Sequence, residues 1–395
     1  MRLQDVCTVF SDGDWIESKD QSNKGIRLVQ TGNIGEGLYL EKEERAKYVS
    51  EEIFESLKCT EIYPGDILIS RLPEPVGRAC IIPPKKERMI TAVDCTICRV
   101  DESIVSKEYL CYFMRSNAYY TKLLGSVTGT TRKRISRKNL GNIELEIPPK
   151  EEQTDVVSQL ECLINVINSR NKELQLFDNL IKARFVEMFG DPYVNPLKWK
   201  KLKIKDAVTI EPQNGLYKPQ SDYVTDGTGI PILRIDGFYD GMVTDFASLK
   251  RLKCSETERQ RYLLLEDDIV INRVNSIEYL GKCAHIKEIL EDTVYESNMM
   301  RMHFDPEYYN PVYICELLCS QYIYDQIVNH AKKSVNQASI NQKDVLDFNI
   351  YQPPLDLQNE FADFVNQVNK SKVKVQKALD ETQKLFDSLM QQYFG

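Results

Sequence analysis

The sequence of 395 residues lacks several features that define large classes of protein. No stretch approaches the ~20 consecutive apolar residues that a membrane-spanning helix needs. The chain does not open with a basic segment followed by an apolar run, so we expect no signal peptide. Its eleven cysteines, an odd number without regular spacing, are typical of free thiols in a reducing compartment. The sequence therefore predicts a globular, cytoplasmic protein without a membrane partner.

Catalytic motifs are also missing. The chain contains no GxxxxGK[ST] phosphate-binding loop, and its three histidines have no metal-ligand spacing. A DNA amino-methyltransferase would carry Asn or Asp, two prolines and an aromatic residue in succession. Here the residues that follow the proline pairs are Lys85, Lys150 and Leu355. We therefore predict no catalytic residues, no metal and no cofactor, and a chain that is not itself an enzyme.

The formal net charge of −8 at first disfavours a nucleic-acid partner, but the acidic residues are unevenly distributed. Residues 1–150 carry 23 basic and 22 acidic residues, a net of +1, whereas residues 191–354 carry 19 and 24, a net of −5. Because a local basic face matters more than the whole-chain total, DNA binding stays possible. The acidic second half counts mildly against it.

What the chain does contain is an internal repeat with a period of about 205 residues. GDILIS at 65–70 corresponds to DDIVIN at 267–272, and IPP at 147–149 corresponds to QPP at 352–354. Short β-rich runs around 66–70, 79–82 and 90–100, with a helical stretch at 107–124 matched by 308–331, predict a mixed α/β fold. The period is too long for a solenoid, so it indicates duplicated domains.

After each proline pair comes a stretch of about 35 residues without Pro or Gly, which predicts a long helix. Apolar residues recur at heptad spacing in both, which favours antiparallel coiled-coil packing over ordinary core helices. At 1.5 Å per residue each helix would be about 52 Å long, more than the width of a ~150-residue domain. The predicted packing positions are Leu160, Leu163, Ile167, Leu174, Phe177, Ile181 and Met188 in the first helix, and Phe361, Val365, Val368, Val375, Leu379, Phe386 and Leu389 in the second.

The strongest local signal is TGTTRKRISRK at 128–138, with five basic residues in seven positions beside glycine and hydroxyl groups. Such a loop can neutralise several phosphates, although a solvated basic loop is equally consistent with a charge run alone. The matching segment KKSVNQASI at 332–340 replaces much of the charge by amides, which can read adenine edges. The candidate DNA-binding residues of this loop pair are Thr130, Thr131, Arg132, Lys133, Arg134, Arg137 and Lys138 in the first copy, and Lys332, Lys333, Asn336, Gln337 and Lys343 in the second.

A second group of candidates comes from the strand ends, where surface charges without function are about as probable. Its members are Arg71, Arg78, Lys85 and Lys86 in the first copy, and Arg273, Asn275 and Lys282 in the second.

Cys95 and Cys98 form a CxxC pair, which could be half of a zinc site or a redox pair. In the repeat their places are taken by Met299 and Met302. Because methionine is an apolar core residue, we interpret the two cysteines as core thiols that behave as small apolar residues on a strand, not as ligands.

The chain resembles the DNA-specificity subunits of type I restriction-modification systems along essentially its whole length. The resemblance is carried by GDILISR at 65–71, the TGTTRKRIS loop, IPPKEEQ at 147–153 and NLIKARFVEMFGDP at 179–192. In the second copy QPPLDLQ and the closing LMQQYFG agree. Each motif is moderately specific, whereas their order and duplication are highly so.

The resemblance implies two target-recognition domains, at 1–150 and 191–354, and two conserved helical spacers, at 151–190 and 355–395. Each domain would read one half of a split, asymmetric site in double-stranded DNA. The helices would pack antiparallel, fix the gap between the halves and dock two methyltransferase subunits, and motor-nuclease subunits would join through the complex. Two other interpretations remain: a self-sufficient enzyme, and a coiled-coil scaffold that binds no DNA.

Overall fold

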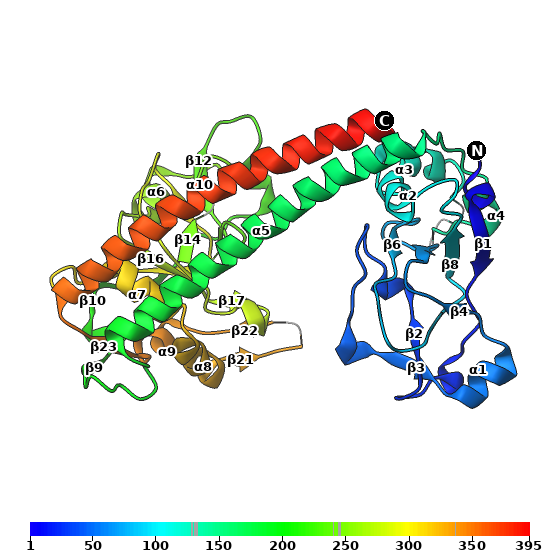
Figure 1. Ribbon diagram of the computed structural model, residues 1–395. Helices are drawn as coiled ribbons and strands as arrows, with labels where there is room; N and C mark the ends of the chain where they lie inside the picture. Colours follow the sequence, from blue (N-terminus) through cyan, green and yellow to red (C-terminus); the bar gives the residue numbers. More distant parts are fainter. Residues whose placement is uncertain (128, 130–132, 240, 244–245, 336) are drawn as a thin grey trace. The chain divides into compact units, whose positions relative to one another are not determined.

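The computed structural model describes residues 1–127, 129, 133–239, 241–243, 246–335 and 337–395. The chain forms two compact units. Unit 1 consists of Met1–Asn171 with Gln376–Gly395, and unit 2 of Lys172–Val375. Each unit therefore joins one globular domain to part of both long helices, α5 (Lys150–Phe189) and α10 (Leu355–Phe394) (Figure 1).

Unit 1 contains two sheets. The first is antiparallel, with strand order β1-β8-β5-β6; the second has the order β3-β2-β7-β4, in which β2 and β7 are parallel. The strands are β1 (Cys7–Asp12), β2 (Ile26–Val29), β3 (Lys47–Val49), β4 (Glu61–Ile62), β5 (Ile67–Ser70), β6 (Ala79–Ile81), β7 (Met89–Thr91) and β8 (Cys95–Val100). The helices of the domain are α1 (Glu51–Leu57), α2 (Lys107–Phe113), α3 (Asn117–Leu124) and α4 (Arg137–Gly141).

Unit 2 repeats this arrangement with additions. Strands in the order β10-β20-β16-β18 reproduce the first sheet, and a parallel pair, β12 with β19, reproduces β2 with β7. The strands are β9 (Lys200–Lys203), β10 (Val208–Asn214), β11 (Tyr223–Val224), β12 (Ile230–Leu233), β13 (Phe238–Tyr239), β14 (Gly241–Val243), β15 (Arg251–Leu252), β16 (Ile269–Asn272), β17 (Val274–Asn275), β18 (Cys283–His285), β19 (Val294–Tyr295), β20 (Met299–Phe304), β21 (Lys332–Lys333), β22 (Ala338–Ser339) and β23 (Asn349–Gln352). The helices of the domain are α6 (Glu256–Tyr262), α7 (Pro311–Leu318), α8 (Gln321–His330) and α9 (Gln342–Leu346).

The aspartate that precedes the central strand in both copies, Asp66 in one and Asp268 in the other, has a structural role. The Asp66 carboxylate accepts the Tyr63 N–H at 2.9 Å and forms two 2.8 Å hydrogen bonds with Arg99 across the sheet. In the second copy Asp268 accepts the Leu265 N–H at 2.8 Å in the same way. Each aspartate is buried, so the paired charge and the backbone bond are what make its burial tolerable. This explains why the Asp recurs before both fully buried strands.

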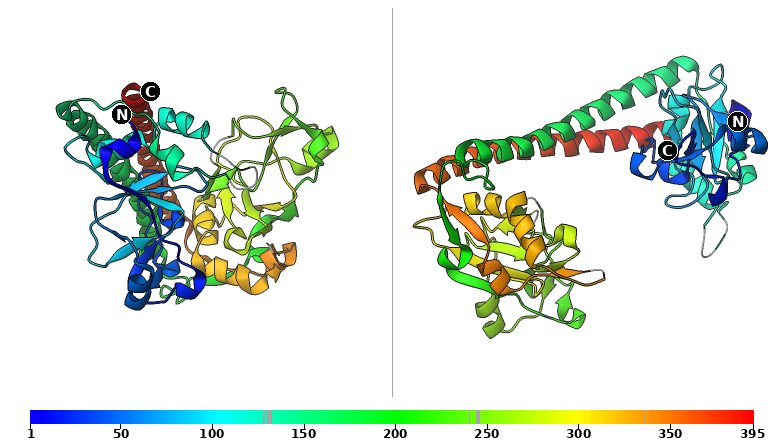
Figure 2. Two further views of the ribbon diagram at one scale, coloured as in Figure 1. Left: turned by 90° about the vertical axis from the view of Figure 1, so that its right-hand side faces the viewer. Right: turned by 90° about the horizontal axis from the view of Figure 1, so that it is seen from below.

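The predicted mixed α/β class with two globular domains and two long antiparallel helices is confirmed. In unit 1 the start of α5 packs against the end of α10, where Leu160 and Phe386 share one core with the globular domain. Phe394 continues this contact, with its ring centroid 5.1 Å from that of Tyr109. Figure 2 shows the red end of α10 reaching the N-terminal domain.

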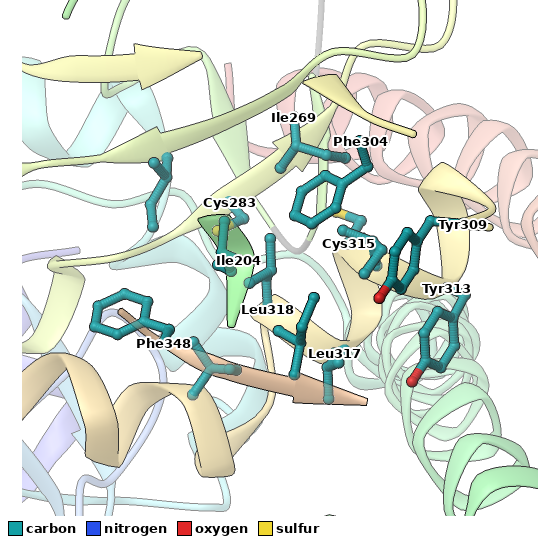
Figure 3. Packing of buried hydrophobic residues seen from close by; sticks show 14 of the residues in the cluster. Ile204, Ile269, Cys283, Phe304, Tyr309, Tyr313, Cys315, Leu317, Leu318 and Phe348 are labelled. Carbon is teal, nitrogen blue, oxygen red and sulfur yellow. The ribbon is translucent and has the colours of Figure 1, made fainter. Parts of the chain in front are cut away.

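In unit 2 the opposite ends of the same helices pack together. Phe185 and Phe361 face each other with ring centroids 5.6 Å apart, and Phe185 stacks on Tyr313 of α7 at 5.7 Å. Figure 3 shows Tyr313 within this core together with Phe304 and Tyr309. The helix ends are therefore integral to each globular core.

The middle of the helices is held by polar contacts as well as by the apolar seam. Arg170, which interrupts the seam in the sequence, donates to the Ala378 carbonyl and to Thr382 of α10 within unit 1. In unit 2 Lys372 pairs with Asp178. The predicted seam residues in this stretch, including Leu174, Val375 and Leu379, are half-buried.

None of the helices in the described part of the chain is long and apolar enough to cross a membrane.

A buried glutamine ties the start of each long helix to its globular domain. The side-chain oxygen Oε1 of Gln153 accepts the Ser106 N–H at 2.8 Å. The side-chain Nε2 donates to the backbone carbonyls of Ile104 and Pro148. The side-chain oxygen Oε1 of Gln358 likewise accepts the Asn310 N–H at 2.9 Å. Its Nε2 donates to the backbone carbonyls of Tyr308 and Pro353. Ser106 and Asn310 are the N-caps of α2 and α7, so in each copy one glutamine side chain connects a domain helix, the proline turn and the long helix.

Replacing this glutamine should destabilise the chain strongly. Gln358→Ala leaves buried partners unsatisfied and should lower the free energy of unfolding by about 3 kcal/mol. The matched control is Gln383→Ala on the same helix, where the exposed side chain donates to Asp387; it should cost less than about 0.5 kcal/mol. Denaturant titration measures both. Equal losses in the two variants would contradict the role assigned to Gln358.

Candidate nucleic-acid interface

The basic loop of unit 1 is anchored at its C-terminal end. Ile135 is fully buried, and its N–H donates to the Arg71 carbonyl at 3.3 Å. Directly after it, the Ser136 hydroxyl accepts the Asn139 N–H and caps α4. This leaves Lys133, Arg134, Arg137 and Lys138 exposed around a fixed point.

Two carboxylates sit among these cations. Asp12, at the end of β1, lies 3.4 Å from the Arg71 Nε and 3.8 Å from an Arg137 nitrogen. Asp94, in the turn before β8, pairs with Arg134 at 2.7 Å. Burial lowers the pKa of the Arg71 guanidinium from its ordinary value, and the Asp12 carboxylate opposes this effect. The structure therefore brings three of the predicted basic residues together around acids that the sequence analysis did not select.

The side chains of Arg134 and Asp94 are 45% and 33% exposed, and ion pairs open to solvent contribute little to stability, typically about 0–1 kcal/mol. A phosphate group can replace such a carboxylate partner at little energetic cost and accept the same guanidinium donors.

The second copy keeps the anchor and changes the loop. The N–H of buried Ile340 donates to the Arg273 carbonyl at 3.0 Å, the counterpart of the bond from Ile135 to Arg71. The segment before it forms a hairpin of β21 and β22, and β17 pairs with β22 (Figure 1). This small sheet brings together three predicted residues, which are Asn275, Lys332 and Lys333, and a fourth, Gln337, directly precedes β22.

Arg71 and Arg273 occupy equivalent places and make equivalent contacts. The Arg71 guanidinium donates to the Val93 carbonyl, and Arg273 donates to the Ser297 carbonyl at 3.1 Å. The Nε of each is buried without a hydrogen-bond partner among the described residues. Arg71 is 5% exposed, so it positions its neighbours more than it presents charge to solvent.

The remaining candidates from the strand ends are differently placed. Arg78 is buried and forms four hydrogen bonds to the carbonyls of Thr31, Ile34, Leu72 and Pro75, which commits its guanidinium to holding two loops. Lys85 pairs with Glu41. Lys282 lies over the Tyr279 ring at 4.3 Å. Lys86 and Lys343 are exposed.

Four predicted contact residues lie outside the described part of the chain: Thr130, Thr131, Arg132 and Asn336.

The CxxC pair lies on β8 as buried free thiols. Burial raises the pKa of the Cys95 thiol to about 12. The Cys98 sulfur lies 2.9 Å from the Cys7 sulfur. Among the described residues no group of three or more His, Cys, Asp or Glu side chains could hold a metal ion. The arrangement is that of core side chains on a strand.

The chain contains two copies of one domain, and paired long helices join them. In each copy the same backbone bond anchors the loop, so the chain is a tandem-domain protein with two related surfaces. The family of type I restriction modification DNA specificity domains matches residues 1–176 and again residues 196–382, so the chain belongs to this family. The sequence resemblance to specificity subunits is thereby confirmed.

Curated relatives agree with this assignment. The chain is similar to the specificity subunit of the EcoKI type I restriction enzyme of Escherichia coli, 26% identical over 68% of this chain and 59% of the relative. It is also similar to the StySPI specificity subunit of Salmonella potsdam, 22% identical over 73% of this chain and 64% of the relative. The chain thus spans less than two thirds of either relative's length.

Solved structures show the same fold. A chain from a study of complex assembly and conformational transition of the type I restriction-modification system has a TM-score of 0.58 and 17% identity, covering 100% of this chain and 96% of that chain. The S subunit of the type I system from M. genitalium has a TM-score of 0.55 and 12% identity, covering 99% and 94%.

The thiol assignment predicts a simple labelling pattern. At pH 8 a disulfide reagent such as DTNB should react rapidly with exposed Cys162 and Cys319, whereas Cys95 and Cys98 should react only after unfolding. The variant Cys162→Ser/Cys319→Ser should lose the rapid phase. Stoichiometric zinc in the purified chain, or a lower Tm in the presence of a chelator, would refute the assignment.

Proposed function

We propose that this chain is the non-catalytic, sequence-specific DNA-binding subunit of a type I restriction-modification complex. Its two domains, 1–150 and 191–354, each read one half of a bipartite site in double-stranded DNA. The observation that carries the proposal is the repeated loop anchor, in which Ile135 bonds to Arg71 and Ile340 to Arg273. The same backbone frame presents different side chains in the two copies.

The difference between the loops supports two unlike half-sites. The first presents cations, including Lys133 and Arg134, which suit phosphate contacts and guanine edges. The second presents amides, including Asn275 and Gln337, beside the exposed Lys332 and Lys333. Amide side chains can form paired hydrogen bonds with adenine, so the second domain has polar readers despite its net acidity.

The helices have the form of a spacer. Each is 40 residues long, about 60 Å at 1.5 Å per residue, which exceeds the ~34 Å of one duplex turn. Residues 151–190 and 355–395 would set the gap between the half-sites and dock two methyltransferase subunits, through which motor-nuclease subunits join. Methyl transfer and ATP hydrolysis would then be carried out by these partners.

The loop assignment has a quantitative consequence. Lys133→Ala/Arg134→Ala should weaken binding to duplex DNA and reduce the slope of log affinity against log salt by about 2, because about 0.9 counterions are released per phosphate neutralised. The matched control, Lys377→Ala/Lys384→Ala on the exposed side of α10, removes the same charge and should leave the slope unchanged. Fluorescence anisotropy across a salt series measures both. A wild-type slope in the loop variant would argue for a scaffold without DNA contacts there.

A further inference from the structure

Both copies expose an aromatic side chain at the same point of the fold. Trp15 is 69% exposed in unit 1, and Tyr217 is 77% exposed in unit 2. Each comes two residues after a glycine that ends the edge strand of the main sheet, Gly13 after β1 and Gly215 after β10. A single exposed aromatic residue needs no explanation, but an exposed aromatic residue at the same position in two diverged copies does.

The backbone that carries each aromatic residue is held closely against the sheet. A Cβ added at Gly13 would lie 2.4 Å from the Thr91 carbonyl oxygen, and one at Gly215 would lie 2.3 Å from the Tyr295 carbonyl oxygen. Only glycine permits this approach. The ring is therefore presented from a fixed segment.

A single residue joins this segment to the repeated arginine. In unit 1 the Val93 N–H donates to the Asp14 carbonyl at 2.9 Å, in the peptide group that leads into Trp15, and the Val93 carbonyl accepts the Arg71 guanidinium. In unit 2 the Ser297 N–H donates to the Leu216 carbonyl at 3.0 Å, and the Ser297 carbonyl accepts Arg273. The two networks match bond for bond.

The same turn connects the aromatic segment to the basic loop of unit 1. Asp94, next to Val93, pairs with Arg134, and Asp12, three residues before Trp15, lies beside Arg71 and Arg137. The backbone segment that carries the exposed ring is thus joined to the strand end and the turn that hold the loop cations. Side chains around it differ between copies, Ile16 in one and Lys218 in the other, whereas the aromatic character is kept.

We propose that Trp15 and Tyr217 are DNA-contact residues, one for each half-site, whose rings pack on deoxyribose and base-edge carbon atoms beside the phosphates bound by the loops. The inference rests on the proposed function and adds to it an apolar contact that each domain makes in the same place. Arg71 and Arg273 act as positioning residues, since their guanidinium groups donate to the carbonyls of Val93 and Ser297, the residues whose N–H groups bond to the ring segments.

The two tryptophans of the chain allow a direct test. Trp199, whose indole N–H donates to the Phe189 carbonyl at 2.9 Å, is the internal reference. In Trp199→Phe, which leaves Trp15, a mixed-sequence duplex several helical turns long should quench the fluorescence as it binds. In Trp15→Phe, which leaves Trp199, the same duplex should change the fluorescence little.

Affinity separates the ring from the loop cations. Trp15→Ala should weaken binding of the full chain to this duplex about tenfold while leaving the salt slope unchanged, because an apolar contact releases no counterions. Trp15→Tyr should restore most of the affinity, since the second copy uses tyrosine at this place. Circular dichroism and thermal unfolding identify any variant that fails to fold, and Trp15→Tyr remains informative in that case.

The outcomes are distinct. If the unchanged chain binds no duplex at low salt, the proposed function fails, and the inference fails with it. If the chain binds and Trp15→Ala binds equally well, the inference alone is overturned. If Trp15→Ala keeps its DNA affinity but loses association with the methyltransferase subunits, the ring serves a protein partner and the inference is likewise wrong.

Discussion

The buried glutamine at the start of each long helix is the interaction on which the rest of the molecule depends. Gln153 and Gln358 each satisfy one N–H and two carbonyl groups where a domain helix, a proline turn and a long helix meet. Because the side chain is buried, its loss would leave these groups without partners, so one residue stabilises the point at which each long helix joins its domain. The spacer role proposed for the long helices requires such a joint.

The proposed recognition surface follows a different design. Its frame consists of backbone bonds, such as that from Ile340 to Arg273, together with the guanidinium that each repeated arginine gives to a carbonyl. Backbone bonds do not depend on the side chains of the loop, so the loop sequence can change without loss of the frame. The replacement of Arg134 and its neighbours by a hairpin with lysines and amides is what such a frame permits.

Much of this architecture could be predicted from the sequence because it depends on periodicity. The heptads from Leu160 to Met188 indicated a long packed helix, and the repeat placed Cys95 opposite Met299, which identified a core thiol without structural data. The site was harder to predict, because charge does not report burial. Arg78 and Arg134 are both plausible DNA contacts in the sequence. In the structure Arg78 is buried and donates hydrogen bonds to four carbonyls, whereas Arg134 lies near the surface. Asp12 and Trp15 were missed because each is isolated in the sequence, although aligning Gly13 with Gly215 pairs the two exposed aromatic residues.

The central claim is that one chain holds two readers of different DNA sequences in a fixed frame. It is tested most directly by sequencing the methylated bases in cells that express this chain with its methyltransferase subunits, and then with residues 1–150 exchanged for the first domain of another family member. The account predicts a bipartite motif with two unlike halves and a constant gap, of which the exchange changes one half and leaves the other half and the gap intact. A single continuous motif, or a change in both halves after the exchange, would contradict it.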